Sequence, residues 1–161
     1  MADPKWLGKP EEKDYAAAHS YLSLLLAPDP LREALALLRH APEGAWRAKD
    51  ILRAAGLPLL KRKQSSEVAE KLNHIASGIA ISPILLLHDG RGRLEIADGY
   101  HRACAACIVN EDTRVPGRLA LLRNLTWWSP SALVQPSAPG SPRRSAPQVG
   151  EDAAEGKDGD D

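Results

Sequence analysis

The sequence predicts an α+β fold, and three observations lead to this class. A near-continuous apolar run at residues 81–87 has the length of a strand that is buried on both faces. A second short apolar run, residues 94–97, follows the turn signal Asp89-Gly90-Arg91-Gly92. Apolar residues recur with helical spacing before these runs, and a helix is expected again from Tyr100 to Val109. Helices therefore surround a small group of strands.

The N-terminal residues predict two helices that pack as a hairpin. The first covers residues 15–27, with Asp14 as its N-terminal cap. The second covers residues 31–40, with Asp29 as its cap and Pro30 near its first position. We expect these helices to form an N-terminal extension over residues 1–47.

Two further helices are predicted before the strands. The first covers residues 46–55 and ends at Gly56, which suits a left-handed C-terminal position. The second has Ser66 as its N-terminal cap and continues to about residue 77. The basic cluster Lys61-Arg62-Lys63 lies between them, where it is either a solvated loop or a contact for nucleic acid.

The strand region ends with a third predicted strand at residues 115–122. Pro116 lacks a backbone N–H, so this strand is expected at an edge of the sheet. Asn110 is expected to end the preceding helix in a left-handed conformation. A domain over residues 48–128 would contain these elements. A Pro-, Ser- and Gly-rich acidic segment over residues 129–161 is predicted to be a disordered tail.

Composition narrows the classes of function. The chain has 161 residues, with 21 basic and 21 acidic side chains. Residues 1–128 hold 18 basic and 15 acidic residues, which is far less basic than a dedicated nucleic-acid binder. No stretch has the length and apolarity of a membrane span, and no apolar run follows Met1. With only Cys104 and Cys107, the sequence predicts a reduced, cytoplasmic protein.

The candidate site is the junction at which the second strand turns into a helix. Asp98-Gly99 forms the turn, and Tyr100, His101 and Arg102 occupy the first helical turn. Free N–H groups and the positive end of the helix dipole favour an anion there. Arg102 can add a bidentate contact to phosphate, or it can form an ion pair with Asp98 instead. We therefore expect residues 98–102 to bind phosphate.

Other side chains near this junction have alternative roles. His101 is the candidate catalytic proton donor, or it only bonds to backbone carbonyls. Tyr100 either stacks on a base or belongs to the core. Cys104 and Cys107 lack further ligands, so no metal site is predicted and they are expected to be small buried side chains. The pair Trp127-Trp128 either stacks on bases or closes the apolar edge of the domain.

Three segments together resemble the ParB/sulfiredoxin superfamily. They are Ser82-Pro83-Ile84-Leu85-Leu86, the run from Ile96 to Ala106 that contains Asp98-Gly99-Tyr100-His101-Arg102, and Val115-Pro116-Gly117-Arg118-Leu119. The resemblance covers residues 48–122 and is closest to a bacterial branch with added N-terminal helices. It implies a small mixed sheet with packed helices, a phosphate contact for Arg102, and a triphosphate nucleotide, with Mg²⁺, as the ligand.

The sequence differs from sulfiredoxins and from ParB proteins at positions that matter for their activities. Sulfiredoxins have a nucleophilic cysteine at the position of Tyr100, and a phenol is a poor replacement for a thiolate, so sulfinic-acid reduction is not expected. ParB proteins have a helix-turn-helix region after this fold, and the sequence predicts none after residue 122. The leading hypothesis is a phosphate- or nucleotide-binding domain, with nucleotide hydrolysis as an open question. The alternatives are a DNA-associated module or ParB-like nuclease, and a protein-interaction module with a vestigial site.

Overall fold

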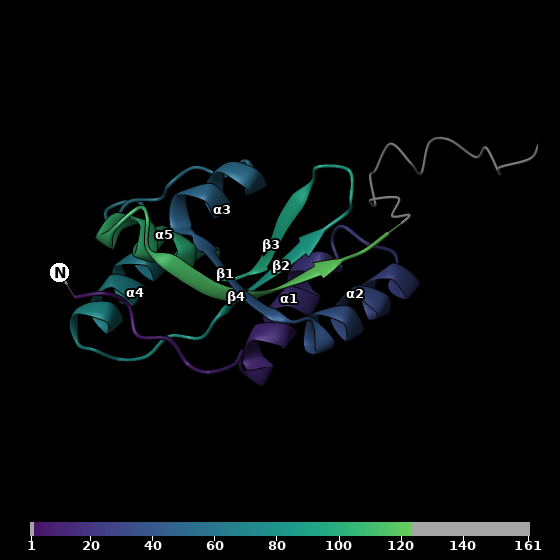
Figure 1. Ribbon diagram of the computed structural model, residues 1–161, viewed down its shortest axis with the longest axis horizontal. Coiled ribbons are helices and arrows are strands. Elements are labelled where there is room, and N and C mark those ends of the chain that lie inside the picture. Colours follow the sequence, from purple (N-terminus) through teal and green to yellow (C-terminus); the bar gives the residue numbers. More distant parts are fainter. Residues whose placement is uncertain (1, 124–161) are drawn as a thin grey trace, which may run out of the picture. The chain divides into compact units, whose positions relative to one another are not determined.

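The computed structural model describes residues 2–123 and confirms the α+β class. Five helices accompany a four-stranded mixed sheet in this part of the chain (Figure 1). The elements in chain order are α1 (Glu12–Leu22), α2 (Pro28–His40), β1 (Glu43–Arg47), α3 (Ala48–Ala55), α4 (Ser66–Ala76), β2 (Ile84–His88), β3 (Leu94–Asp98), α5 (Tyr100–Val109) and β4 (Arg114–Leu121). The predicted tail and the pair Trp127-Trp128 lie outside the described residues.

The strands have the spatial order β1-β4-β2-β3, so the last strand of the chain lies inside the sheet. β4 pairs antiparallel with β1 and parallel with β2, and β2 pairs antiparallel with β3. The prediction of an edge strand around Pro116 is therefore wrong. The β2 ladder begins opposite Gly117, one residue after the proline, so its missing N–H removes no bond from that ladder.

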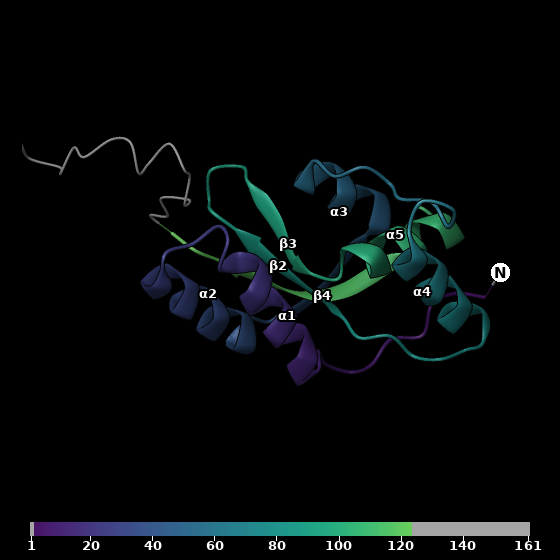
Figure 2. The same ribbon diagram turned by 180° about the vertical axis from the view of Figure 1, so that it is seen from behind.

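Helices cover both faces of the sheet, with α1 and α2 on one face and α3, α4 and α5 on the other (Figures 1 and 2). β2 supplies both cores because successive side chains of a strand point to opposite faces. Ile84 and Leu86 pack toward α3–α5, and Leu85 and Leu87 pack toward α1 and α2. The prediction of a strand buried on both faces is thus confirmed, although its pairing begins at Ile84 rather than at residue 81.

The N-terminal helices differ from their predicted bounds. α1 begins at Glu12 and ends at Leu22, and its N-cap is Glu11, so the prediction of Asp14 as the cap is wrong. The Asp14 carboxylate accepts a hydrogen bond from the Glu11 N–H (2.7 Å) as the third helical residue of a capping box. α2 begins at Pro28 with Ala27 as its N-cap, which places Asp29 inside the first turn instead of at the cap.

The segment predicted as one helix over residues 46–55 is a strand followed by a helix. β1 ends at Arg47, α3 begins at Ala48, and Gly56 ends α3 with φ 66°, as predicted. α4 begins at Ser66 with Ser65, not Ser66, as the capping residue. α5 has the predicted bounds, but Asn110 follows it in an extended conformation, so the prediction of a left-handed residue there is wrong.

Candidate functional site: a pocket over the start of α5

The candidate site begins at Gly99, which joins β3 to α5. Gly99 has a φ of 104°, a conformation that residues with a side chain rarely adopt. A Cβ atom at this position would lie 2.4 Å from Cγ2 of Ile84, far inside van der Waals contact. Glycine is therefore required by the backbone conformation and also by the close approach to β2. Among residues 2–123, no side chain caps the start of α5, so its first-turn N–H groups stay available in this part of the chain.

A pocket of about 900 Å³ lies over this helix start. It is bounded by α1, α4, α5, the end of β3 and the segment that leads into β2. All five residues that the sequence predicts as the site, 98–102, line it. The other lining residues are Leu7, Glu11, Lys13, Asp14, Ala17, Tyr21, Leu57, Lys71, His74, Ile79, Ala80, Ile81, Ser82, Ile96 and Ala97.

Arg102 lies at the base of the pocket in a buried ion-pair network. Its side chain is only 8% exposed, and its guanidinium contacts Asp14 (3.1 Å) and Asp98. It also donates to the carbonyl oxygens of Ser82 (2.8 Å) and Pro83 (3.2 Å) and to the Ser82 hydroxyl. Arg102 therefore joins α5 to α1 and to the segment that precedes β2.

The sequence allowed Arg102 either a phosphate contact or an ion pair with Asp98, and the structure shows the ion pair. The second partner, Asp14, was not predicted from the sequence. Asp14 is buried in the first turn of α1, and its Oδ1 accepts a hydrogen bond from the Ser82 hydroxyl (3.0 Å). The sequence offers one signal for the contact between Asp14 and Arg102, namely an acidic residue in the first turn of a helix.

Two carboxylates share one guanidinium in this network. The pKa of Asp98 is raised to about 6, because burial and the nearby Asp14 carboxylate together outweigh the opposing effect of the Arg102 guanidinium, with burial the largest cause. Asp98 can therefore accept a proton closer to neutral pH than an exposed aspartate does. The charge at the base of the pocket changes by one unit when it does so.

The first two residues of α5, Tyr100 and His101, have different surroundings. Tyr100 donates a hydrogen bond from its hydroxyl to the Pro58 carbonyl (2.6 Å), and burial raises the pKa of this phenol. The Tyr100 ring also contacts the His101 ring, with 5.5 Å between ring centroids. His101 is half-buried and makes no hydrogen bond to residues 2–123. Its imidazole is thus available to a ligand in the pocket, whereas the Tyr100 hydroxyl already has a partner.

Further cationic side chains reach the pocket from other helices. Lys13 of α1 forms an ion pair with Glu11 (2.8 Å), and Lys71 of α4 forms one with Glu70 (3.0 Å). His74 lies one turn after Lys71 and also lines the pocket. Both acidic partners are substantially exposed, so a phosphate can compete for these lysines. Sequence reasoning missed all three residues because they converge only when α1 and α4 pack around α5.

The two cysteines of α5 lie away from this arrangement of charges. Both are free thiols, Cys104 buried and Cys107 half-buried, and burial raises the pKa of each. Within residues 2–123, no group of three or more His, Cys, Asp or Glu side chains is placed to hold a metal ion. The structure therefore offers no protein-only cation site to the candidate pocket in this part of the chain.

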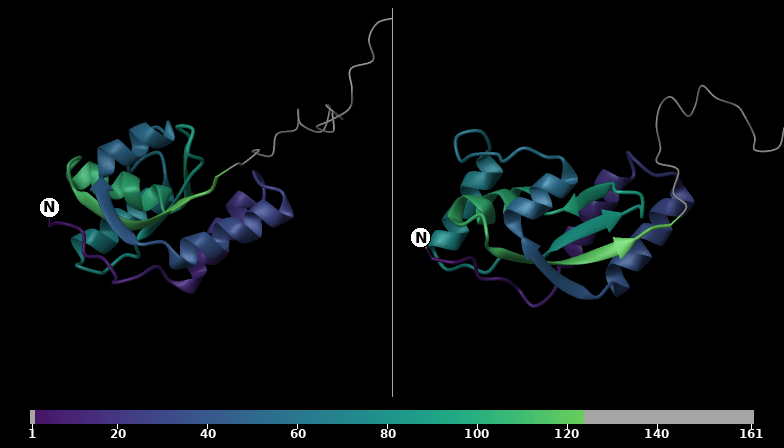
Figure 3. Two further views of the ribbon diagram at one scale, coloured as in Figure 1. Left: turned by 45° about the vertical axis from the view of Figure 1, so that its right-hand side comes forward. Right: turned by 45° about the horizontal axis from the view of Figure 1, so that its top comes forward.

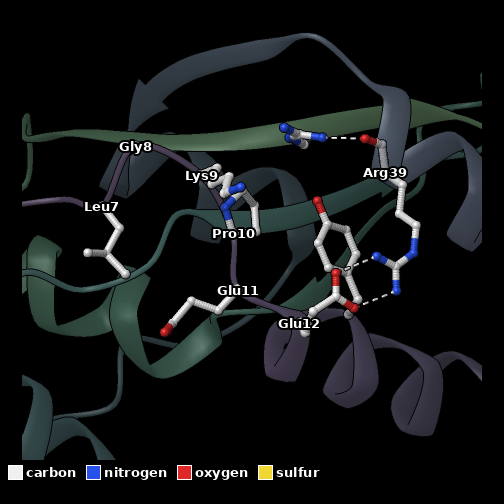
Figure 4. Close-up of a pocket in the computed structure, with 9 residues that line it drawn as sticks. Leu7, Gly8, Lys9, Pro10, Glu11, Glu12 and Arg39 are labelled. Atoms are coloured by element: carbon white, nitrogen blue, oxygen red, sulfur yellow. Dashed lines mark hydrogen bonds and ion pairs between the residues drawn. The ribbon is translucent and has the colours of Figure 1, made fainter.

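A second pocket, of about 600 Å³, lies between the N-terminal segment and helices α1 and α2 (Figure 4). The Arg39 guanidinium faces the Glu12 carboxylate across it, with N–O distances of 2.8 and 3.0 Å (Figure 4). Arg39 also stacks over the Tyr15 ring at 4.4 Å, and Arg118 donates to the Arg39 carbonyl. These contacts hold α2 against α1 and β4, so Arg39 and Arg118 already serve the packing of the helices.

Comparison of the chain with protein-family models, curated proteins and solved structures finds no match to any of the three. Among the helices of residues 2–123, none has the length and apolarity needed to cross a membrane.

Proposed function

We propose that this domain binds a phosphate-bearing small molecule, a nucleotide in the first instance, in the pocket over the start of α5. The observation that carries the proposal is the convergence of an uncapped helix start with Lys13, Lys71 and His101 on one pocket. Main-chain N–H groups at a helix N-terminus and flexible ammonium groups together form a common phosphate environment.

Arg102 has an indirect role in this proposal. Its guanidinium is buried against Asp14 and Asp98, so it offsets two carboxylates that would otherwise repel a phosphate. The phosphate contacts then come from the first-turn N–H groups of α5 and from Lys13 and Lys71. The role differs from the direct phosphate contact that the sequence resemblance implies for Arg102.

Partly exposed apolar side chains in the pocket lining favour a ligand that also has a flat apolar part. Leu57, Ile79 and Tyr21 line the pocket and remain 37%, 50% and 41% exposed. A nucleobase that covers them would remove apolar surface from water while its phosphates lie at the helix start. The pocket volume lies within the range of ordinary small-molecule sites, and the ParB/sulfiredoxin resemblance favours a triphosphate.

The test is thermal unfolding of the full chain with a panel of nucleoside mono-, di- and triphosphates, with and without Mg²⁺, followed by calorimetric titration. A nucleotide at about one hundred times its dissociation constant adds about 2.7 kcal/mol to the free energy of unfolding, which gives a clear rise in midpoint. Inorganic phosphate and the matching nucleoside, titrated separately, report on the two halves of the pocket.

Variants locate the binding site. Lys13→Ala and Lys71→Ala should each weaken binding about tenfold, the effect of losing one charge-assisted contact. Lys63→Ala is the matched control, because Lys63 is an exposed lysine that does not line the pocket. The proposal fails if no nucleotide raises the midpoint at millimolar concentration, or if the control weakens binding as much as the two pocket variants.

One observation supports the alternative hypothesis of a DNA-associated role. Lys61, Arg62 and Lys63 are all exposed in the loop between α3 and α4. If this loop binds DNA, the affinity falls steeply with salt, and neutralising the three residues together reduces that slope by up to about three. Unchanged binding after their replacement would exclude the loop as a DNA contact.

A further inference from the structure

In the part of the chain that the structure describes, residues 2–123, β1 is an edge strand whose outer side has no partner in the sheet. It pairs with β4 alone, and none of its five residues is buried, whereas four of the five residues of β2 are. β1 forms the outer margin of the sheet beside β4 (Figure 3). An open edge of this kind presents unpaired backbone N–H and C=O groups that can pair with another strand.

The ladder to β4 determines which residues of β1 have free backbone groups. The N–H of Ala48, just after β1, donates to the Thr113 carbonyl (2.9 Å) in the same register. In an antiparallel pair, hydrogen-bonded and non-hydrogen-bonded residues alternate along each strand. This alternation, counted back from Ala48, means that the backbone groups of Trp46 and Gly44 bond to β4. The N–H and C=O groups of residues 43, 45 and 47 therefore point outward.

The sequence of β1, Glu-Gly-Ala-Trp-Arg, is complementary to itself when it is paired antiparallel. A two-fold axis at Ala45 makes Ala45 a hydrogen-bonded pair with its own copy, which agrees with the outward direction of its backbone groups. The same register places Glu43 opposite Arg47 of the second copy, and Arg47 opposite Glu43. Opposite charges in directly facing positions stabilise a strand pair.

The remaining positions also fit this register. Gly44 lies opposite Trp46 of the second copy, so each indole faces a residue that has no side chain. The Trp46 ring already folds over Gly44 of its own strand, where a Cβ atom would be only 2.7 Å from the ring. In this register neither Trp46 lies directly opposite the Trp46 of the other copy.

The charged residues of β1 are available for such pairing. Glu43 is 50% exposed with its nearest cation, Arg118, at 3.7 Å, and Arg47 is 55% exposed with Asp112 at 3.7 Å. These long contacts leave both charged groups free to turn toward a facing strand.

The outward carbonyl of Ala45 accepts a hydrogen bond from the Arg114 side chain (2.6 Å). Arg114 is exposed, and a carbonyl oxygen has two lone pairs, so this contact does not prevent a strand from pairing there.

We propose that β1 is a homodimerisation edge, in which two copies of this chain pair antiparallel about Ala45 and join their sheets into one continuous sheet. The occupant is a second copy because the charge pattern matches itself in the antiparallel direction only. A parallel pairing would place Glu43 opposite Glu43 and Arg47 opposite Arg47.

Sedimentation of the full chain over about 10 µM to about 1 mM tests the dimer, a range chosen for a small interface. Glu43→Arg and Arg47→Glu each turn two attractive cross-strand pairs into two repulsive ones. Each should raise the dissociation constant about tenfold or more. Circular dichroism confirms that the variants are folded, and Arg53→Glu, the reversal of an exposed arginine on α3, is the matched control.

The decisive measurement is a mixture of the two variants. Glu43→Arg has two positive residues on β1 and Arg47→Glu has two negative ones, so each opposes its own copy but matches the other. The mixture should therefore form a heterodimer with an affinity at least equal to that of the original chain.

Three outcomes would overturn the proposal. They are a full chain that stays monomeric at about 1 mM, a dimer that is insensitive to both reversals, and a mixture that does not associate although each variant is folded. A dimer insensitive to the reversals would use another surface. A monomeric chain that still binds an extended peptide at β1 would show that the edge serves a different partner.

Discussion

Replacement of Gly99 by alanine tests the local structure of the site most sharply. The substitution places a side chain at a φ of 104°, which costs about 1–3 kcal/mol. The new Cβ would also lie 2.4 Å from Cγ2 of Ile84, and overpacking of a core costs a further 1–3 kcal/mol, roughly. We expect the Gly99→Ala variant to lose about 4 kcal/mol of unfolding free energy. The corresponding fall in melting midpoint is roughly 15 °C.

Other glycines of the chain separate the two contributions. Gly56 has a φ of 66°, and within residues 2–123 no atom beyond its two chain neighbours lies within 4 Å of the position that an alanine methyl group would take there. Gly56→Ala therefore measures the backbone cost alone, about 1–2 kcal/mol. Gly8 has neither a positive φ nor a close neighbour, so Gly8→Ala should change stability by less than about 0.5 kcal/mol.

Urea unfolding of the full chain, followed by circular dichroism, gives all three free energies on one scale. The expected order of destabilisation is Gly99→Ala, then Gly56→Ala, then Gly8→Ala. If Gly99→Ala costs no more than Gly56→Ala, the close approach of Ile84 is not a constraint and the reasoning is refuted.

Three further predictions concern the buried charges and the thiols. Arg102→Met leaves two carboxylates without their cation and should cost about 3–5 kcal/mol in urea unfolding, against less than about 1 kcal/mol for Arg53→Met, which removes an exposed arginine of α3. The pKa of Asp98 is raised from 3.8 to about 6 in the folded state, so the folded state binds a proton more tightly than the unfolded state. Stability relative to Asp98→Asn should therefore fall as pH rises from 3.8 to about 6, and a difference that rises over this range would contradict the assignment. In a thiol-labelling time course at neutral pH, Cys107 should react before the fully buried Cys104, and equal rates would show that α5 opens as a unit.

The sequence predicted α5 and its turn well because their signals are local. Asp98-Gly99 separates an apolar run from a helical one, and a positive φ at that glycine needs no long-range information. β1 was missed for the opposite reason. Its five residues gain their strand conformation from pairing with β4, and the apolar spacing across Trp46 and α3 imitates one helix.

The chemistry of the site was predictable only in part. Residues 98–102 do line one pocket, and their proximity follows from adjacency in the chain. The partner of Arg102 in α1, Asp14, and the cations Lys13 and Lys71 arrive from helices that are distant in sequence. The sequence shows each of these charges, but only the packing of α1 and α4 shows which of them meet.

The position of β4 inside the sheet has a consequence for the order of folding. β1, β2 and β3 are all synthesised before β4, yet β4 is the strand that joins β1 to β2. Until Arg114–Leu121 is available, the hairpin of β2 and β3 can form, but β1 has no strand to pair with. Closure of the sheet is then a late, long-range step, and such steps slow folding. A nascent chain that stops before β4 would expose the apolar strand β2 along one side, which makes it a natural substrate for chaperones.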